Sequence, residues 1–159
     1  MKDVIKNIAQ LCAVFESGEI PSFHDAEIVS ILLNREDNVS IETVILIYRV
    51  IEEYKIGEKK IIRRKNAYCS FRFEGVKVDI LRDFNHQNVI NDINISPEED
   101  SDLLRIHFQS IFGCDLKFLC REIELTRVRV SESVKEHYEP NLEELKKRLQ
   151  AAKKSENKD

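Results

Sequence analysis

Glycine is scarce in this sequence. Only four glycines occur in 159 residues, whereas phosphate-cradling loops and dinucleotide-binding turns need several closely spaced glycines. Neither motif is present, nor is the Gly-x-Ser-x-Gly turn that carries the nucleophile of many hydrolases. The four histidines show no His-x-His or His-x-x-x-His spacing, so the signal for a metal site is weak. We therefore predict that the chain is not an enzyme and has no cofactor.

The cysteines are few and widely spaced. Cys12, Cys69, Cys114 and Cys120 include no Cys-x-x-Cys pair, and Cys69 and Cys120 lie in apolar, strand-like runs. These features favour free buried thiols in a reducing compartment. No apolar run approaches the ~18–20 residues that span a bilayer, and polar residues interrupt the N-terminal segment where a signal peptide needs an apolar core. The sequence therefore predicts a cytoplasmic protein that does not bind membranes.

Charge is unevenly distributed along the chain. The formal net charge of −4 argues against general binding to nucleic acid or to an anionic membrane. Residues 55–65 carry six basic residues and one acidic residue, but they contain no aromatic side chain to stack on bases. A solvated loop or a charged strand edge fits this stretch. Residues 74–102 carry eight acidic residues against two basic ones, which can steer a basic partner or can simply keep loops solvated.

The middle of the chain is rich in strand patterns. Residues 28–33 form one apolar run, and residues 39–50 alternate two largely apolar sets. The second run predicts either a long strand covered on both faces or a strand that leads into an irregular segment. Phe71 and Phe73 alternate with polar residues, and Gly75 then indicates a hairpin turn or a bulge. Because no helical patterns separate these strands, we expect an antiparallel sheet rather than parallel β-α-β units.

Helical spacing occurs near the two ends of the chain. Residues 2–16 place apolar side chains on one face, namely Val4 or Ile5, Ile8, Leu11, Cys12 and Phe15. Pro140 suits the first turn of a C-terminal helix, in which Leu142, Leu145 and Leu149 form an apolar stripe. The predicted fold class is α+β, with a mainly antiparallel, curved or barrel-like β-sheet, an N-terminal helix and a C-terminal helix. We predict a single domain over residues 1–152 and a flexible tail over residues 153–159.

Two polar clusters are candidate sites. The first holds His24, Asp25 and Glu27, directly before the run at 28–33, and the second holds Asn85, His86, Gln87 and Asn88. A histidine beside carboxylates can act as a general base or a metal ligand. A small metal-binding or hydrolytic domain that uses His24, Asp25, Glu27 and His86 is therefore one hypothesis.

A structural role is the other hypothesis for both clusters. Neighbouring residues of a strand point to opposite faces of the sheet, and Asp and Asn side chains commonly bond to backbone amides in turns. We expect His24 and Asp25 to fix the start of the first strand, with the turn at residues 84–88 as their partner.

Three segments together resemble a known family. They are FHDAEIVSILLNRE (residues 23–36), FRFEGVKVDILRDFNHQNVINDINI (71–95) and FGCDLKFLCREIELTRVRV (112–130). In this order they resemble the immunity protein 50 family of bacterial polymorphic toxin systems. The resemblance implies a non-enzymatic protein that binds and neutralises a cognate toxin made by the same cell. It supplies neither an interface nor a functional residue.

The acidic region offers a candidate surface for such a toxin. A small domain usually blocks an enzyme by burying on the order of 1,600 Å² with complementary charge. We expect partner contacts from the acidic side chains of this region, namely Asp83, Asp92, Glu98, Glu99, Asp100 and Asp102. Because an open sheet exposes strand edges, the chain is expected to be a monomer or a weak homo-oligomer.

Overall fold

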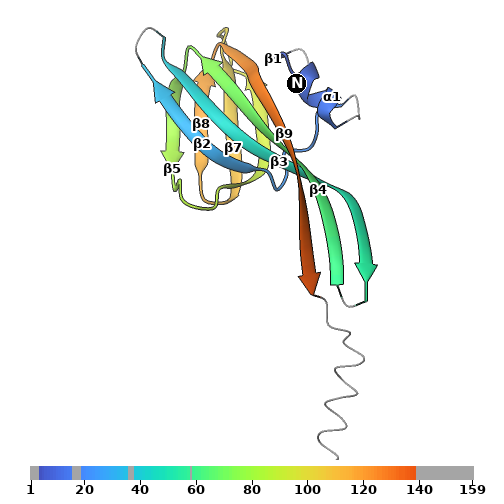
Figure 1. Ribbon diagram of the computed structural model, residues 1–159. Coiled ribbons are helices and arrows are strands. Elements are labelled where there is room, and N and C mark those ends of the chain that lie inside the picture. The colour runs from blue at the N-terminus through green and yellow to red at the C-terminus, as the bar shows by residue number, and fades with distance from the viewer. Residues whose placement is uncertain (1–3, 16–18, 36–37, 58, 139–159) are drawn as a thin grey trace, which may run out of the picture. The chain divides into compact units, whose positions relative to one another are not determined.

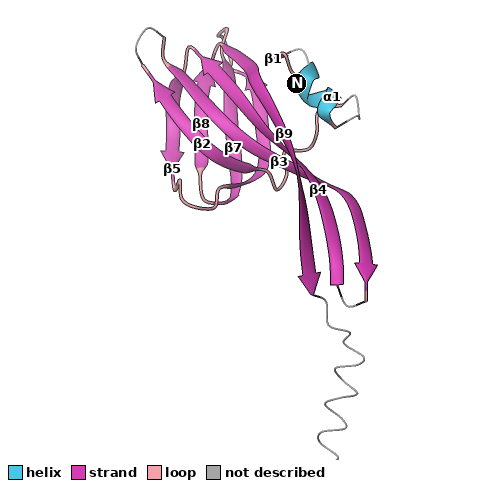
Figure 2. Ribbon diagram, viewed as in Figure 1, coloured by secondary structure: helices cyan, strands magenta, loops and turns pink. Residues whose placement is uncertain are grey.

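Strands dominate the structure. The computed structural model describes residues 4–15, 19–35, 38–57 and 59–138, which contain nine strands and one short helix (Figure 2). The chain divides into two compact units. Unit 1 comprises Met1–Tyr48 and Asn66–Ser131, and unit 2 comprises Arg49–Lys65 and Glu132–Asp159.

The strands form one open sheet. In the order of the chain, the elements are β1 (Ile5–Lys6), α1 (Ala9–Val14), β2 (Glu27–Asn34), β3 (Ser40–Ile56), β4 (Lys59–Glu74), β5 (Lys77–Arg82), β6 (Val89–Pro97), β7 (Leu104–Phe112), β8 (Asp115–Cys120) and β9 (Glu122–Tyr138). The order across the sheet is β1-β9-β4-β3-β2-β6-β7-β8-β5 (Figure 1). The short β1 pairs in parallel with β9, whereas β6, β7, β8 and β5 are joined by antiparallel ladders.

The sheet of unit 1 curves so that distant strands face each other. Phe73 of β4 packs edge-on against Phe118 of β8, with ring centroids 4.9 Å apart, and against Phe108 of β7 at 6.0 Å. An apolar void of about 20 Å³ lies in this core, and it offers no polar partners for a water molecule. The prediction of a mainly antiparallel, curved sheet is therefore confirmed. The barrel-like alternative is corrected, because β1 and β5 remain as edges of the sheet.

The N-terminal helix exists but is shorter than predicted. Ile5 belongs to β1 and α1 begins only at Ala9. Asn7 lies between them with φ of 63°, a left-handed conformation that Asn tolerates and that ends a strand. The predicted apolar face is nevertheless buried, because Ile8, Leu11 and the other members of the set except Val4 pack into the core.

Several strand predictions hold and two need correction. The run at 28–33 lies in β2, and the run at 39–50 lies, except for Val39, in the 17-residue β3. Gly75 adopts φ of 64° but forms no hairpin, because β4 lies between β9 and β3 whereas β5 pairs with β8. The basic stretch at 55–65 is not a loop: it spans the end of β3 and the start of β4.

Unit 2 contains residues 49–56 of β3, 59–65 of β4 and 132–138 of β9. Cross-strand ion pairs line it: Arg63 bonds to Glu52 at 2.8 Å and to Glu132 at 3.3 Å, and Lys60 bonds to Glu53 at 2.8 Å. The predicted C-terminal helix and the tail at 153–159 lie outside the described residues. Across the described ranges, no helix combines the length and the apolar character that a bilayer crossing requires.

Candidate functional site

The segment before β2 is a tight backbone corner. Asp25 has φ of 64°, and its amide donates to the carbonyl oxygen of Ile90 at 3.0 Å. The amide of Ala26 donates to the carbonyl oxygen of Phe23, also at 3.0 Å. Phe23 and Ala26 are buried, and the Phe23 ring packs edge-on against Phe71. The chain therefore turns here so that its apolar residues enter the core and its polar residues remain outside.

The side chains of His24 and Asp25 face solvent. The two are 57% and 58% exposed, and Nδ1 of His24 lies 3.2 Å from Oδ2 of Asp25. The amide of His24 donates to Oγ of Ser22. No contact of the described side chains joins either residue to the turn at 84–88. The expectation that His24 and Asp25 fix the start of the first strand holds for the backbone amide of Asp25, which bonds to Ile90 rather than to the 84–88 turn. The turn bonds instead to the backbone of Ile28, through Asn88.

Asn88 organises the corner. Its side chain is buried, its Oδ1 accepts from the amides of Asn85 at 2.9 Å and Cys114 at 3.1 Å, and its Nδ2 donates to the carbonyl oxygens of Asn85 at 2.6 Å and Ile28 at 3.4 Å. The carbonyl oxygen of Asn88 accepts from the amide of Ile28 at 2.9 Å. One amide side chain thus links β2, the 84–88 turn and the β7–β8 turn, because both of its polar atoms can be satisfied at once.

Gly113 completes this corner. It adopts φ of 77°, and a Cβ atom there would lie 2.7 Å from Oδ1 of Asn88 and closer still to the carbonyl oxygen of Gln87. Only glycine fits that position without displacing the turn. Asn85 adds two local bonds, from Nδ2 to the carbonyl oxygen of Asp83 and from the amide of Gln87 to its Oδ1. The second polar cluster is therefore a structural turn, as one of the two hypotheses expected.

The residues proposed for metal or acid–base chemistry do not gather. His86 is exposed in the 84–88 turn, and Glu27 is partly buried at the start of β2. Across the residues that the structure describes, no group of three or more His, Cys, Asp and Glu side chains could hold a metal ion. The hypothesis of a metal-binding or hydrolytic site at His24, Asp25, Glu27 and His86 therefore finds no support in this geometry.

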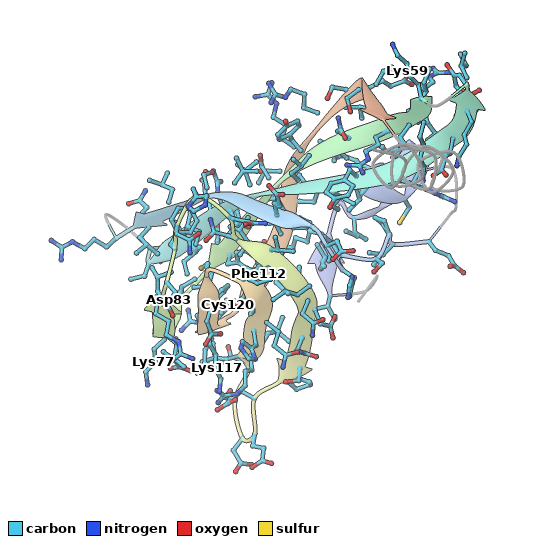
Figure 3. All side chains as sticks on the ribbon, turned by 90° about the horizontal axis from the view of Figure 1, so that it is seen from below. Lys59, Lys77, Asp83, Phe112, Lys117 and Cys120 are labelled. Carbon is cyan, nitrogen blue, oxygen red and sulfur yellow. The ribbon has the colours of Figure 1, made fainter. Side chains whose placement is uncertain are left out.

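The six acidic residues do not form one surface. Asp83 follows β5 beside the 84–88 turn, and Asp92 lies within β6, where its Oδ1 accepts from the amide of Ile93. The other four lie in the β6–β7 loop, at the opposite end of these strands, as the pairings of Val89 with Phe112 and of Pro97 with Leu104 require. In Figure 3 this loop projects beyond the ends of β6 and β7.

Cross-strand neighbours neutralise much of the acidic region. Glu98 accepts two bonds from Arg105, at 2.7 and 2.5 Å, and Asp79 lies 3.4 Å from the same guanidinium. Lys77 and Lys117 both point outward from β5 and β8 (Figure 3). Glu99, Asp100 and Asp102 are exposed at the loop tip. We name these three residues the acidic tip, and none of them forms an ion pair with another residue that the structure describes.

Sequence reasoning missed one cluster of charged and polar side chains on this face. His107 places Nε2 2.9 Å from Oδ1 of Asp115, and Arg82 donates twice to Oδ2 of Asp115, at 3.1 and 2.8 Å. The hydrogen bond from His107 lowers the pKa of Asp115 below its ordinary value, and the bonds from Arg82 add to this effect although burial opposes it. The three residues come from β7, β8 and β5, so only the strand register could have revealed the cluster.

The fold and the corner together define the class of protein. This is a small, largely antiparallel β-sheet protein whose three characteristic segments meet around Asn88. The family model of Immunity protein 50 matches residues 7–131, and the chain belongs to this family. No curated protein and no solved structure matches the chain.

Proposed function

We propose that this chain is an immunity protein that binds a cognate toxin of the same bacterium and neutralises it by occupying its surface. The observation that carries the proposal is the family match over residues 7–131. Family membership implies toxin neutralisation, and the geometry is compatible with neutralisation by binding. The side chains of Asn88 and Asn85 bond to backbone groups at the corner, which supports a role as a rigid scaffold.

The acidic tip is the surface that we favour for the toxin contact. Its three carboxylates project on a hairpin loop whose base is held by the Glu98–Arg105 pair and by the bond from the amide of Glu98 to the carbonyl oxygen of Leu103 at 2.9 Å. A preorganised loop loses less conformational entropy on binding than a mobile one. Grouped negative charge would favour a basic partner and would raise the association rate. Asp83 and Asp92 lie apart from this tip and contribute less.

We also propose a cytoplasmic site of action. An inhibitor of a toxin made by the same cell has to meet the toxin where its targets are, and the free buried cysteines Cys12, Cys69, Cys114 and Cys120 suit a reducing compartment.

Coexpression with a toxin tests this proposal. The toxin domain encoded next to this gene is expressed with and without the chain, and growth and recovery of a complex are measured. We expect growth only with the chain and a complex of the two proteins on size exclusion. A His24→Ala, His86→Ala double variant should protect as well as the native chain. Loss of protection in that variant would instead support histidine chemistry.

A further inference from the structure

One strand of unit 1 has an open, apolar edge. Among the described residues, β2 pairs with β6 at a single position, Glu27 with Val89, and the amide of Ile28 bonds to Asn88. Beyond that point β2 pairs only with β3. The backbone of residues 29–34 therefore presents unpaired amide and carbonyl groups on one side, which is a ready template for another strand.

The side chains along this edge are apolar and exposed. Val29, Leu32 and Leu33 are 47%, 59% and 53% exposed, and no charged residue occurs between Glu27 and Arg35. The edge formed by β5 differs, because β5 carries Lys77, Asp79 and Arg82 within six residues. Charged residues of this kind discourage strand addition. The β2 edge has no such protection.

Exposed apolar side chains also occur near the end of this edge where Asn88 bonds to Ile28. Phe84 and Phe112 are 48% and 61% exposed, and Phe112 is labelled in Figure 3. Phe84 adjoins Asn85, whose amide and carbonyl groups bond to the Asn88 side chain that also bonds to Ile28. Contiguous exposed apolar surface is typical of contact sites.

We propose that a second copy of this chain adds to the β2 edge in antiparallel register, so that two sheets become continuous across a two-fold axis. The charges at the two ends of the strand select this occupant. Glu27 lies at the start of β2 and Arg35 directly after its end, and neither has an ion-pair partner among the residues that the structure describes. Antiparallel pairing brings Glu27 of one copy to Arg35 of the other, whereas parallel pairing would align like charges.

The open edge also sets the register. The Asn88 contact closes the edge at Ile28, and β2 ends at Asn34. A two-fold antiparallel register places one residue opposite its own copy, and we assign that position to Leu32, which lies near the centre of the open stretch. Leu32 then lies opposite its own copy, and Ile31 lies opposite Leu33. Arg35 of the second copy then lies near Val29, where β2 has an irregularity between Ile28 and Ser30, and Glu27 follows two residues along the chain. The same patch serves both copies, as a two-fold interface requires. This inference does not depend on the proposed toxin.

Sedimentation velocity of the purified native chain, from about 1 µM to about 1 mM, tests the proposal. We expect a monomer–dimer equilibrium. Leu32→Lys places two ammonium groups opposite each other and should weaken association about tenfold or more. Val130→Lys alters a residue of β9 that is 42% exposed and should leave association unchanged. Unchanged thermal unfolding would show that each variant is folded.

A charge exchange provides the second test. Glu27→Arg and Arg35→Glu should each weaken dimerisation, and the double variant should restore it, because the two charges then meet in reversed order. A native chain that stays monomeric at every concentration would overturn the proposal. Dimerisation that survives Leu32→Lys, or a double variant without restoration, would also overturn it. The proposal would also be overturned if the native chain were monomeric and Leu32→Lys abolished toxin capture. The β2 edge would then bind the toxin and not a second copy.

Discussion

Asn88 is the residue on which the family corner depends most. Its buried side chain bonds to the amides of Asn85 and Cys114, and removal of the amide group leaves those donors without partners inside the protein. We predict that Asn88→Ala lowers the free energy of unfolding by about 3 kcal/mol. Chemical denaturation monitored by circular dichroism measures this change.

His24 provides the matched control for Asn88. It belongs to the same family corner, but its ring is exposed, and its polar contact within the described part of the chain is with Asp25. His24→Ala should change the free energy of unfolding by less than about 0.5 kcal/mol. If His24→Ala cost as much as Asn88→Ala, the assignment of the corner to Asn88 would be wrong.

Asp115 should make stability depend on pH in the acid range. The folded state lowers the pKa of this carboxyl group, so protonation costs more in the folded chain than in the unfolded chain. The stabilisation is therefore present above the unfolded pKa, near 4, and is lost as the pH falls through the folded pKa.

Replacement of Asp115 exposes that dependence. At pH 7, Asp115→Asn should lower the free energy of unfolding by about 1 kcal/mol, because it weakens the bonds to His107 and Arg82. The difference between variant and native chain should shrink below about pH 4. A difference that grew on acidification would contradict this account. Denaturation curves over a pH series provide the measurement.

At the scale of elements, the sequence predicted the strands better than it predicted which strands pair with each other. Alternation placed Phe71 and Phe73 on the buried face of β4, because that period is a property of one strand alone. It did not show that β5 leaves β4 to pair with β8, since pairing depends on contacts between distant segments. For the same reason the acidic excess of residues 74–102 suggested one acidic surface. Arg105 and Lys117, which lie outside that segment, share its sheet face.

For the candidate site too, local features could be predicted from the sequence and contacts between distant segments could not. The sequence identified the two polar clusters and the possibility that they are corners, because Asp and Asn have known turn chemistry. It assigned the link between them to His24, whereas Asn88 makes it. Burial distinguishes the two residues, and burial is set by the packed sheet rather than by residue type. The N-terminal helix was predicted to begin too early, because Ile5 suits a helical face and a strand equally well.

The cysteines of the strands should be unreactive while the chain is folded. Cys69 of β4 and Cys120 of β8 are fully buried, as is Cys114 in the β7–β8 turn. Burial raises the pKa of Cys69 and Cys120 to about 12 and that of Cys114 to about 11. Because the thiolate is the reactive form, we predict no labelling of these three residues by iodoacetamide at pH 8 and full labelling in denaturant. Mass spectrometry detects the adducts, and rapid labelling of the folded chain would contradict the assigned core.

At the scale of the whole molecule, charge should govern the rate of toxin binding. Glu99→Lys with Asp102→Lys reverses the acidic tip without touching the Glu98–Arg105 pair. We predict an association rate about tenfold lower at low salt, and a smaller difference at about 1 M salt, where charges are screened beyond about 3 Å. Stopped-flow binding measures both rates.

Asp92→Lys is the matched charge reversal for that experiment. Asp92 lies on β6, away from the loop tip, so its reversal should affect the rate much less. Equal effects of the two reversals would mean that overall charge, and not the acidic tip, steers the partner.

The central claim is that the chain neutralises its toxin by occupying it, one molecule for each toxin. The most direct test is titration of the residual activity of a fixed amount of toxin against increasing amounts of this chain. We predict that activity falls linearly and reaches zero near equimolar amounts, with no further loss on longer incubation. Progressive inactivation of the toxin by a small fraction of an equivalent would show turnover and would contradict the account.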